Sequence, residues 1–191
     1  MGVNLLVTPA LIDALAEIFA RLLSLGVGQA TLLRPKPPSL PGGDAAWYAA
    51  NRLRRADLIC LRRVLTAWQG ALRLHIDSAL VGLMGDVPPS RLRQRGVYGC
   101  APGRRICTVW PDGQVTPCSF LGDLVAGNAR EMPFAVLWAR GQGWERLRDP
   151  ARLPGGRCAG CAVAAQCGGT RCIARCEQGD LDGGDDACAG S

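Results

Sequence analysis

Cysteines dominate the chemistry that this sequence can perform. The chain has ten cysteines in 191 residues, and nine of them lie between Cys100 and Cys188. The tenth, Cys60, lies in an apolar helical segment (LICLRRVL), where we expect a packed core position. Because thiolates are good ligands for zinc and for iron–sulfur clusters, the second half of the chain is predicted to bind metal.

The spacing of the later cysteines is typical of a metal-chelating loop. Cys158 and Cys161 form a C-x2-C pair, and five residues separate Cys161 from Cys167. Two thiolates on one tight turn can bind the same ion or cluster, and the backbone N–H groups of the turn offset their charge. Structural zinc uses the same pair, and disulfides are the alternative in an oxidising compartment. The pair alone leaves all three interpretations open.

The earlier cysteines surround a predicted β-hairpin. The chain reads CAPGRRICTVWPDGQVTPC over residues 100–118. Within it, PDG is typical of a tight turn between two short strands, ICTVW and QVTPC. We expect this hairpin to bring Cys107 and Cys118 near each other.

The whole pattern resembles the SPASM domain of radical SAM enzymes. Twelve residues separate Cys100 from Gly113 and four separate Gly113 from Cys118; C-x2-C-x5-C, a nearby cysteine and a last cysteine follow. Accessory features of that family also match within residues 99–189: the turn PDGQVTPCSF, the CGG at 167–169 and the GD at 179–180.

This resemblance implies two auxiliary [4Fe–4S] clusters. The family expects the downstream ligand of the first cluster at C-x3-C spacing, whereas this chain offers C-x4-C to Cys172, with Thr170 where a CGGC motif has cysteine. Spacing favours Cys172 as that ligand, and Cys176 is the alternative. The implied ligands are Cys100, Cys107, Cys118 and Cys172 for cluster I, and Cys158, Cys161, Cys167 and Cys188 for cluster II.

The same resemblance limits what the chain is expected to do alone. Radical SAM enzymes bind S-adenosylmethionine at a cluster held by C-x3-C-x2-C, and this sequence has no such motif. We expect the C-terminal portion of a peptide-maturase-like enzyme, which by itself does not cleave S-adenosylmethionine. In a complete enzyme it would work with an upstream radical SAM segment and a peptide substrate. The alternative function is a zinc-binding interaction or nucleic-acid module.

The first half supplies the elements that would position this region. Apolar segments at 2–7, 30–34 and 71–77 read as strands, and apolar spacing predicts helices after Pro9 and within 54–68. This β-α-β-α-β order predicts an α/β fold with parallel strands. Three parallel strands alone are too few to close a barrel, and a parallel sheet needs cover on both faces. By resemblance, residues 1–98 are the later βα units of a partial parallel (β/α) barrel.

The second half has a different character. Its high content of Gly, Pro and Cys predicts a small irregular α+β, cysteine-rich, SPASM-like iron–sulfur domain over residues 99–191. Helical periodicity survives there mainly at 133–147, and the Pro- and Gly-rich stretch at 35–44 reads as a loop in the first half.

Three single residues of the first half are candidates for other roles. Chemistry in barrels gathers at the C-terminal ends of strands. Asp77, which ends the third predicted strand, is therefore a candidate catalytic residue, and Arg34 follows from the same reasoning. His75 is the only histidine, and we expect it in a packed position within that strand.

Charge and N-terminal composition bound the partners and the compartment. The formal net charge is +6, and the arginine clusters at 52–63 and 91–105 are interpreted as solvated helix faces, which makes nucleic-acid binding a minor alternative. The N-terminal segment is a poor signal peptide, and no run of 18 apolar residues occurs. These features predict a cytoplasmic protein with reduced thiols and no membrane span.

Overall fold

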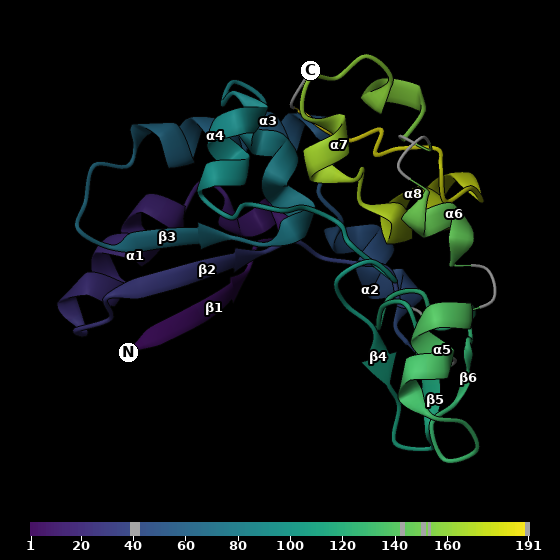
Figure 1. Cartoon of the computed structure of the whole chain (residues 1–191). Helices are drawn as coiled ribbons and strands as arrows, with labels where there is room; N and C mark the ends of the chain where they lie inside the picture. The colour runs from purple at the N-terminus through teal and green to yellow at the C-terminus, as the bar shows by residue number, and fades with distance from the viewer. Residues whose placement is uncertain (39–42, 142–143, 150–151, 153, 190–191) are drawn as a thin grey trace.

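The chain folds as a mixed α/β structure with a parallel sheet at one end and a cysteine-rich region at the other (Figure 1). The computed structural model describes residues 1–38, 43–141, 144–149, 152 and 154–189. Residues 39–42 of the predicted loop and residues 142–143 of the predicted helical stretch lie outside the described residues. No described helix is long and apolar enough to cross a membrane.

The three predicted strands form one sheet. Strands β1 (Gly2–Leu6), β2 (Gln29–Leu33) and β3 (Arg73–Ile76) pair in parallel in the order β1-β2-β3. Val3 lies opposite Ala30, and Ala30 lies opposite Leu74. The parallel direction of the strands predicted from the sequence is therefore confirmed.

Helices cover one face of this sheet. They are α1 (Leu15–Ser24), which follows the 3-10 turn η1 (Pro9–Leu11), and α3 (Arg55–Ala67). Helix α2 (Ala45–Asn51) lies between β2 and α3 in the chain. The helix expected after Pro9 is interrupted, because the chain makes a 3-10 turn before α1 begins and Thr8 makes no side-chain cap. Helix α2 was not predicted. Its first turn is capped by the Asp44 carboxylate, which accepts from the Trp47 N–H at 2.7 Å.

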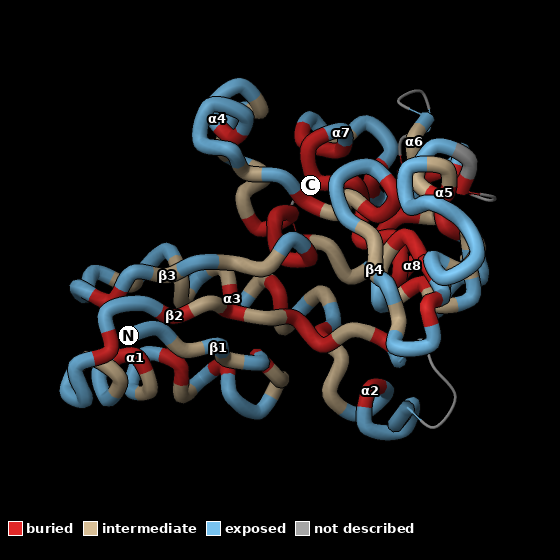
Figure 2. Tube along the Cα trace, turned by 60° about the horizontal axis from the view of Figure 1, so that its bottom comes forward, coloured by how far each residue is buried: buried red, intermediate tan, exposed pale blue. Residues whose placement is uncertain are grey.

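The alternation of side chains along the strands gives the sheet two different faces. Ala30, Leu32 and Leu15 are fully or almost fully buried in the core between the sheet and its helices (Figure 2). On the opposite face, Asn4 and His75 are exposed. The packed position predicted for His75 is wrong, since it lies on the polar side of β3 between two half-buried neighbours.

The position predicted for Cys60 is also wrong. Cys60 is exposed on α3, whereas Leu58 and Leu61 of the same helix are buried. Successive helix residues are about 100° apart, so a residue two positions from a buried one points away from the core. The apolar sequence around Cys60 does not indicate which face of the helix packs against the core.

The cysteine-rich region consists of short elements. After β3 come η2 (Ser78–Met84) and α4 (Pro89–Gln94), followed by the strands β4 (Thr108–Val109), β5 (Gln114–Thr116) and β6 (Gly127–Asn128). The remaining elements are α5 (Phe134–Arg140), α6 (Glu145–Arg148), η3 (Gly156–Cys158), α7 (Ala164–Cys167) and α8 (Arg171–Gln178). The helical stretch predicted at 133–147 is thus two short helices, α5 and α6.

The predicted hairpin is present and gains a third strand. Strand β5 pairs antiparallel with β4 and with β6, and the turn between β4 and β5 uses Gly113 at a φ of 91°. Trp144 is fully buried against Val115 and Leu137, and its indole N–H donates to the Leu124 carbonyl at 3.1 Å. Trp144 is thus a packing residue of the small antiparallel sheet.

The two arginine clusters behave differently. Arg91, Arg93 and Arg95 on and after α4 are exposed, as the sequence predicts. Arg55 and Arg62 of α3 instead reach across to the carbonyl groups of Cys188 and Ala189 near the end of the chain. These two side chains are therefore part of the packing and not of a freely solvated helix face.

Candidate metal centre

Seven of the cysteines lie in two adjoining groups. The Cys158 group is formed by Cys158, Cys161, Cys167 and Cys188, and the Cys100 group by Cys100, Cys118 and Cys172. The N–H of Cys100 donates to the Cys167 carbonyl at 2.7 Å, which joins the two groups through the backbone. The chain thus brings together thiols that are up to 72 residues apart in sequence.

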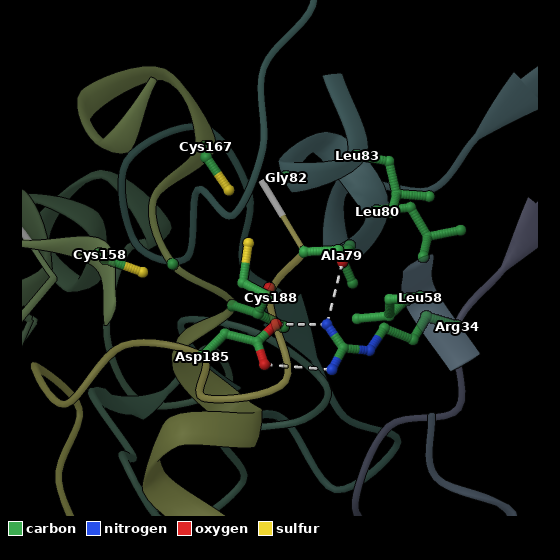
Figure 3. Close-up of a pocket in the computed structure, with 13 residues that line it drawn as sticks. Arg34, Leu58, Ala79, Leu80, Gly82, Leu83, Cys158, Cys167, Asp185 and Cys188 are labelled. Atoms are coloured by element: carbon green, nitrogen blue, oxygen red, sulfur yellow. Dashed lines mark hydrogen bonds and ion pairs between the residues drawn. The ribbon is translucent and has the colours of Figure 1, made fainter. Parts of the chain in front are cut away.

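Four different segments supply the Cys158 group. Cys158 ends η3 and Cys167 ends α7, while Cys188 lies in the C-terminal loop. The sulfurs of these three cysteines point into one shared space, which Gly82 of η2 also borders (Figure 3). Cys161 follows on the tight turn after Cys158, whose carbonyl accepts from the Cys161 N–H at 3.1 Å.

Burial and mutual repulsion act on the thiols of the Cys158 group. Burial raises the pKa of Cys167 to about 12, and the nearby thiols of Cys188, Cys158 and Cys100 add to the rise. Burial also raises the pKa of Cys158, with further contributions from Cys188 and Cys161. Metal-free, the thiols of Cys158 and Cys167 are held in the protonated form at neutral pH, so their binding to a metal cluster must release protons.

The Cys100 group contains one of the two alternatives that the sequence left open for the downstream ligand. Cys172 lies in the first turn of α8 and is 7% exposed. Its pKa is raised first by burial and then by the thiols of Cys100 and Cys118. Burial likewise raises the pKa of Cys100 to about 11. Between the two alternatives for the downstream ligand, the structure brings Cys172 to the other cysteines.

The two remaining cysteines of this half lie elsewhere. Cys107 is half-buried beside Val115 and Trp144, and burial is the only cause that raises its pKa. Cys176 is exposed one turn beyond Cys172, next to Glu177 and Arg52. The hairpin therefore forms as predicted, but the structure does not bring Cys107 into contact with the other predicted ligands of cluster I.

Backbone N–H groups point at several of the sulfurs. The Arg171 N–H donates to the Cys100 sulfur at 3.3 Å. The backbone N–H groups of Asp185, Gly169 and Ile173 act on the thiols of Cys158, Cys167 and Cys172, and each lowers the pKa of its thiol against the larger effect of burial. Such hydrogen bonds stabilise negative charge on a thiolate and tune the potential of a cluster bound to it.

Glycines leave the backbone close to the sulfurs. A Cβ at Gly82 would lie 2.7 Å from the Cys188 sulfur, and one at Gly184 would lie 3.1 Å from the Cys158 sulfur. Gly168 and Gly169, between Cys167 and α8, have φ angles of 73° and 71°, and Thr170 continues the left-handed stretch at 46°. Thr170 is the only described non-glycine residue with positive φ, an unfavourable conformation for a β-branched side chain.

The donor set of the Cys158 group consists of thiols, which are the ligands of iron–sulfur clusters. Among the described residues, no three His, Cys, Asp or Glu side chains lie close enough to hold one metal ion. A four-iron cluster is bound by four cysteine thiolates, so its ligands surround a larger volume. The Cys158 group offers four thiols, no histidine, and N–H donors to its sulfurs.

The candidate catalytic residue Asp77 is engaged in structural contacts. Its carboxylate accepts from the Ala79 N–H at 3.1 Å at the start of η2 and forms an ion pair with Lys36. Burial alone would raise its pKa, but Lys36 and the Ala79 N–H outweigh burial and hold the pKa below its usual value. Asp77 is thus an ionised cap between β3 and η2, and its role as a catalytic residue stays a prediction.

Sequence reasoning missed the charged partner of Arg34. Arg34 follows β2, is 4% exposed, and forms a buried ion pair with Asp185. The place of Arg34 at a strand end is the only local signal for it, and nothing nearby in the sequence indicates an aspartate 151 residues away.

Exposure predicts which thiols react first. In the metal-free chain at neutral pH, iodoacetamide should modify Cys60 well before Cys167, because Cys60 is exposed whereas Cys167 is buried with a raised pKa. Peptide mass spectrometry over time measures both rates. In concentrated urea the two rates should converge, and equal rates in the folded chain would contradict the structure.

Comparison with known proteins identifies the region that carries the cysteines. Residues 100–162 match the SPASM family, described as an iron–sulfur cluster-binding domain. That span contains Cys100, Cys107, Cys118, Cys158 and Cys161, while the remaining cysteines of both groups follow it. The resemblance inferred from the cysteine spacing is therefore confirmed.

Three curated relatives share this part of the chain. All are named AdoMet-dependent heme synthase. The protein from Methanosarcina barkeri is 39% identical over 82 residues, covering 43% of this chain and 23% of the relative. The protein from Nitratidesulfovibrio vulgaris is 34% identical over 82 residues, covering 43% and 22%. The one from Oleidesulfovibrio alaskensis is 34% identical over 73 residues, covering 38% and 18%. The matches thus span less than a quarter of each relative's length.

Proposed function

Because residues 100–162 carry a SPASM iron–sulfur domain, we propose that this chain binds two [4Fe–4S] clusters as the auxiliary-cluster portion of a radical SAM enzyme. The Cys158 group would hold cluster II. The Cys100 group would hold cluster I together with Cys107. Cys107 comes directly before β4, and β4 pairs with β5, the strand that leads to Cys118. The observation that carries the proposal is the gathering of distant cysteines into two adjoining groups with N–H donors to their sulfurs.

Such clusters would supply or accept electrons, or bind the substrate, beside the radical chemistry of the complete enzyme. The contribution of this chain is to hold the sulfurs and to set their electrostatic surroundings. Hydrogen bonds such as that from the Arg171 N–H to the Cys100 sulfur favour the more negative state of a bound cluster. Burial of Cys172 and Cys167 keeps water away from the same sites.

The parallel sheet would be part of the radical SAM barrel. Parallel sheets are normally covered on both faces, but one face of this sheet carries exposed Asn4 and His75. We propose that residues 1–98 complete a partial barrel with a radical SAM segment, and that residues 99–191 form the auxiliary-cluster domain. S-adenosylmethionine would bind only in that complete enzyme, in the reducing environment of the cytoplasm.

The names of the relatives indicate a class of substrate to test. Their name connects them to heme synthesis, which favours a heme-related small molecule over the peptide substrate expected from the sequence. We propose radical modification of a small molecule as the activity to test first in the complete enzyme, with a peptide as the second class.

The test is the metal content of the chain. We expect anaerobic reconstitution with iron and sulfide to yield a brown protein with about eight irons and eight sulfides per chain, the total for two four-iron clusters. Iron and sulfide assays measure this directly. A colourless protein that binds zinc in stoichiometric amounts and no sulfide would contradict the proposal and support the zinc-module alternative.

A further inference from the structure

The last cysteine is held in place by the parallel-sheet half of the chain. Arg34 lies at the end of β2, and its guanidinium reaches Asp185 in the loop that carries Cys188 (Figure 3). Its Nη2 atom donates to the Asp185 Oδ1 atom at 3.1 Å, and its Nη1 atom donates to Oδ2 of the same carboxylate and to the Ala79 carbonyl. Both side chains are almost completely buried, at 3% and 5% exposure.

Asp185 in turn contacts two cysteines of the Cys158 group. Its backbone carbonyl accepts from the Cys188 N–H at 3.0 Å, and its backbone N–H lies near enough to the Cys158 thiol, across the same small cavity, to lower the pKa of that thiol. Its carboxylate also accepts from the Ala187 N–H at 3.1 Å, which closes the loop on itself. A displacement of Asp185 would therefore move the ligands at both ends of the group.

Other contacts hold the same loop against the first half. Arg55 donates to the Cys188 carbonyl, and Ala189 packs into the core formed by the sheet and its helices. Gly82 leaves room for the Cys188 sulfur. Cys188 thus depends on η2, α3 and β2, all of which precede the SPASM match.

We propose that Arg34 and Asp185 form a positioning pair that holds Cys158 and Cys188 in the arrangement needed to bind cluster II. This inference rests on the proposed function. A bidentate guanidinium–carboxylate pair fixes both distance and orientation. Removing one partner leaves the other charge buried without compensation, so the loop shifts to hydrate it and the ligand set opens. Cluster I shares none of these contacts and stays bound.

The test uses the full chain reconstituted anaerobically. Arg34→Met removes the charge at similar length, and Asp185→Asn removes the charge but keeps the backbone contacts. We expect both variants to bind about four irons in place of about eight, with one of the two EPR signals of the reduced protein lost and the other unchanged. A merely structural role would lower both signals together.

The matched control is a second ion pair between the two halves. Arg52 of the first half pairs with Glu177 of α8 at 2.7 Å without contacting a cysteine of either group. We expect Arg52→Ala to keep about eight irons. Folding of each variant is checked by circular dichroism.

The possible outcomes distinguish this inference from the function on which it rests. If Arg34→Met and Asp185→Asn fold and bind as much iron as the wild type, with both EPR signals, the positioning pair is refuted. If Arg34→Met does not fold, Arg34→Lys decides: reduced iron and a weakened single signal support the pair, and full iron content refutes it. A wild-type chain that binds neither iron nor sulfide refutes the proposed function itself.

Discussion

Replacing Cys172 with alanine is expected to halve the iron bound by the reconstituted chain, from about eight to about four irons, whereas replacing Cys176 leaves it unchanged. Cys172 is buried next to Cys100 and Cys118. Cys176 lies one helical turn further along α8 and is exposed beside Glu177 and Arg52. Cys176 is four residues beyond Cys172 and so is displaced by about 6 Å along the helix axis, too far to replace the missing ligand.

The measurement is iron and sulfide content together with the EPR spectrum of the reduced protein. Cys176→Ala is the matched control, since it removes the same group from the same helix. Alanine is preferred to serine because a serine oxygen can itself bind iron. The assignment of Cys172 would be wrong if Cys176→Ala halved the iron content and Cys172→Ala did not.

The second large effect is expected from a single added methyl group at Gly99. Gly99 and Cys100 run against the end of α7: the Gly99 N–H donates to the Gln166 carbonyl at 3.0 Å, and the Cys100 N–H to the Cys167 carbonyl at 2.7 Å. A Cβ at Gly99 would overlap the Cys167 carbonyl, which is backbone and cannot rotate away. We expect Gly99→Ala to destabilise the metal-free chain by about 3 kcal/mol, the upper end for overpacking.

The same substitution should impair both clusters. It separates Cys100 of one group from Cys167 of the other, so iron content should fall well below that of the wild type. Gly28→Ala is the control, because nothing lies within 4 Å of a Cβ at Gly28, and its effect should stay within about 0.5 kcal/mol. Urea unfolding followed by tryptophan fluorescence measures both variants. Equal midpoints for Gly99→Ala and Gly28→Ala would show that the close approach is absent.

Local patterns predicted the elements well where they were long. The strands at 2–7, 30–34 and 71–77 and the helix within 54–68 are present because apolar periodicity reports directly on backbone conformation. Short elements were less predictable. Strand β6 has two residues and α2 has seven, and such elements form only because neighbouring segments provide hydrogen bonds and packing.

Which face of an element is covered could not be inferred in the same way. Cys60 and His75 both lie in apolar stretches of the sequence, yet both are exposed in the structure. Their burial depends on what packs against α3 and β3, and nothing near them in the sequence records it. Helices α1 and α3 pack on one face of the sheet, and the other face carries exposed polar side chains such as Asn4 and His75.

The sequence by itself determined the match to an iron–sulfur domain, because the C-x2-C turn and the spacing of Cys100, Gly113 and Cys118 are local properties of the chain. Only the tertiary structure decided which distant residues meet. It brought Cys172 to Cys100 across 72 residues and paired Arg34 with Asp185 across 151. Such meetings are decided by the burial of whole segments against one another. The contacts that bury Cys172 and leave Cys176 exposed, and those that hold Cys188 against the sheet half, form only when the hydrophobic core forms.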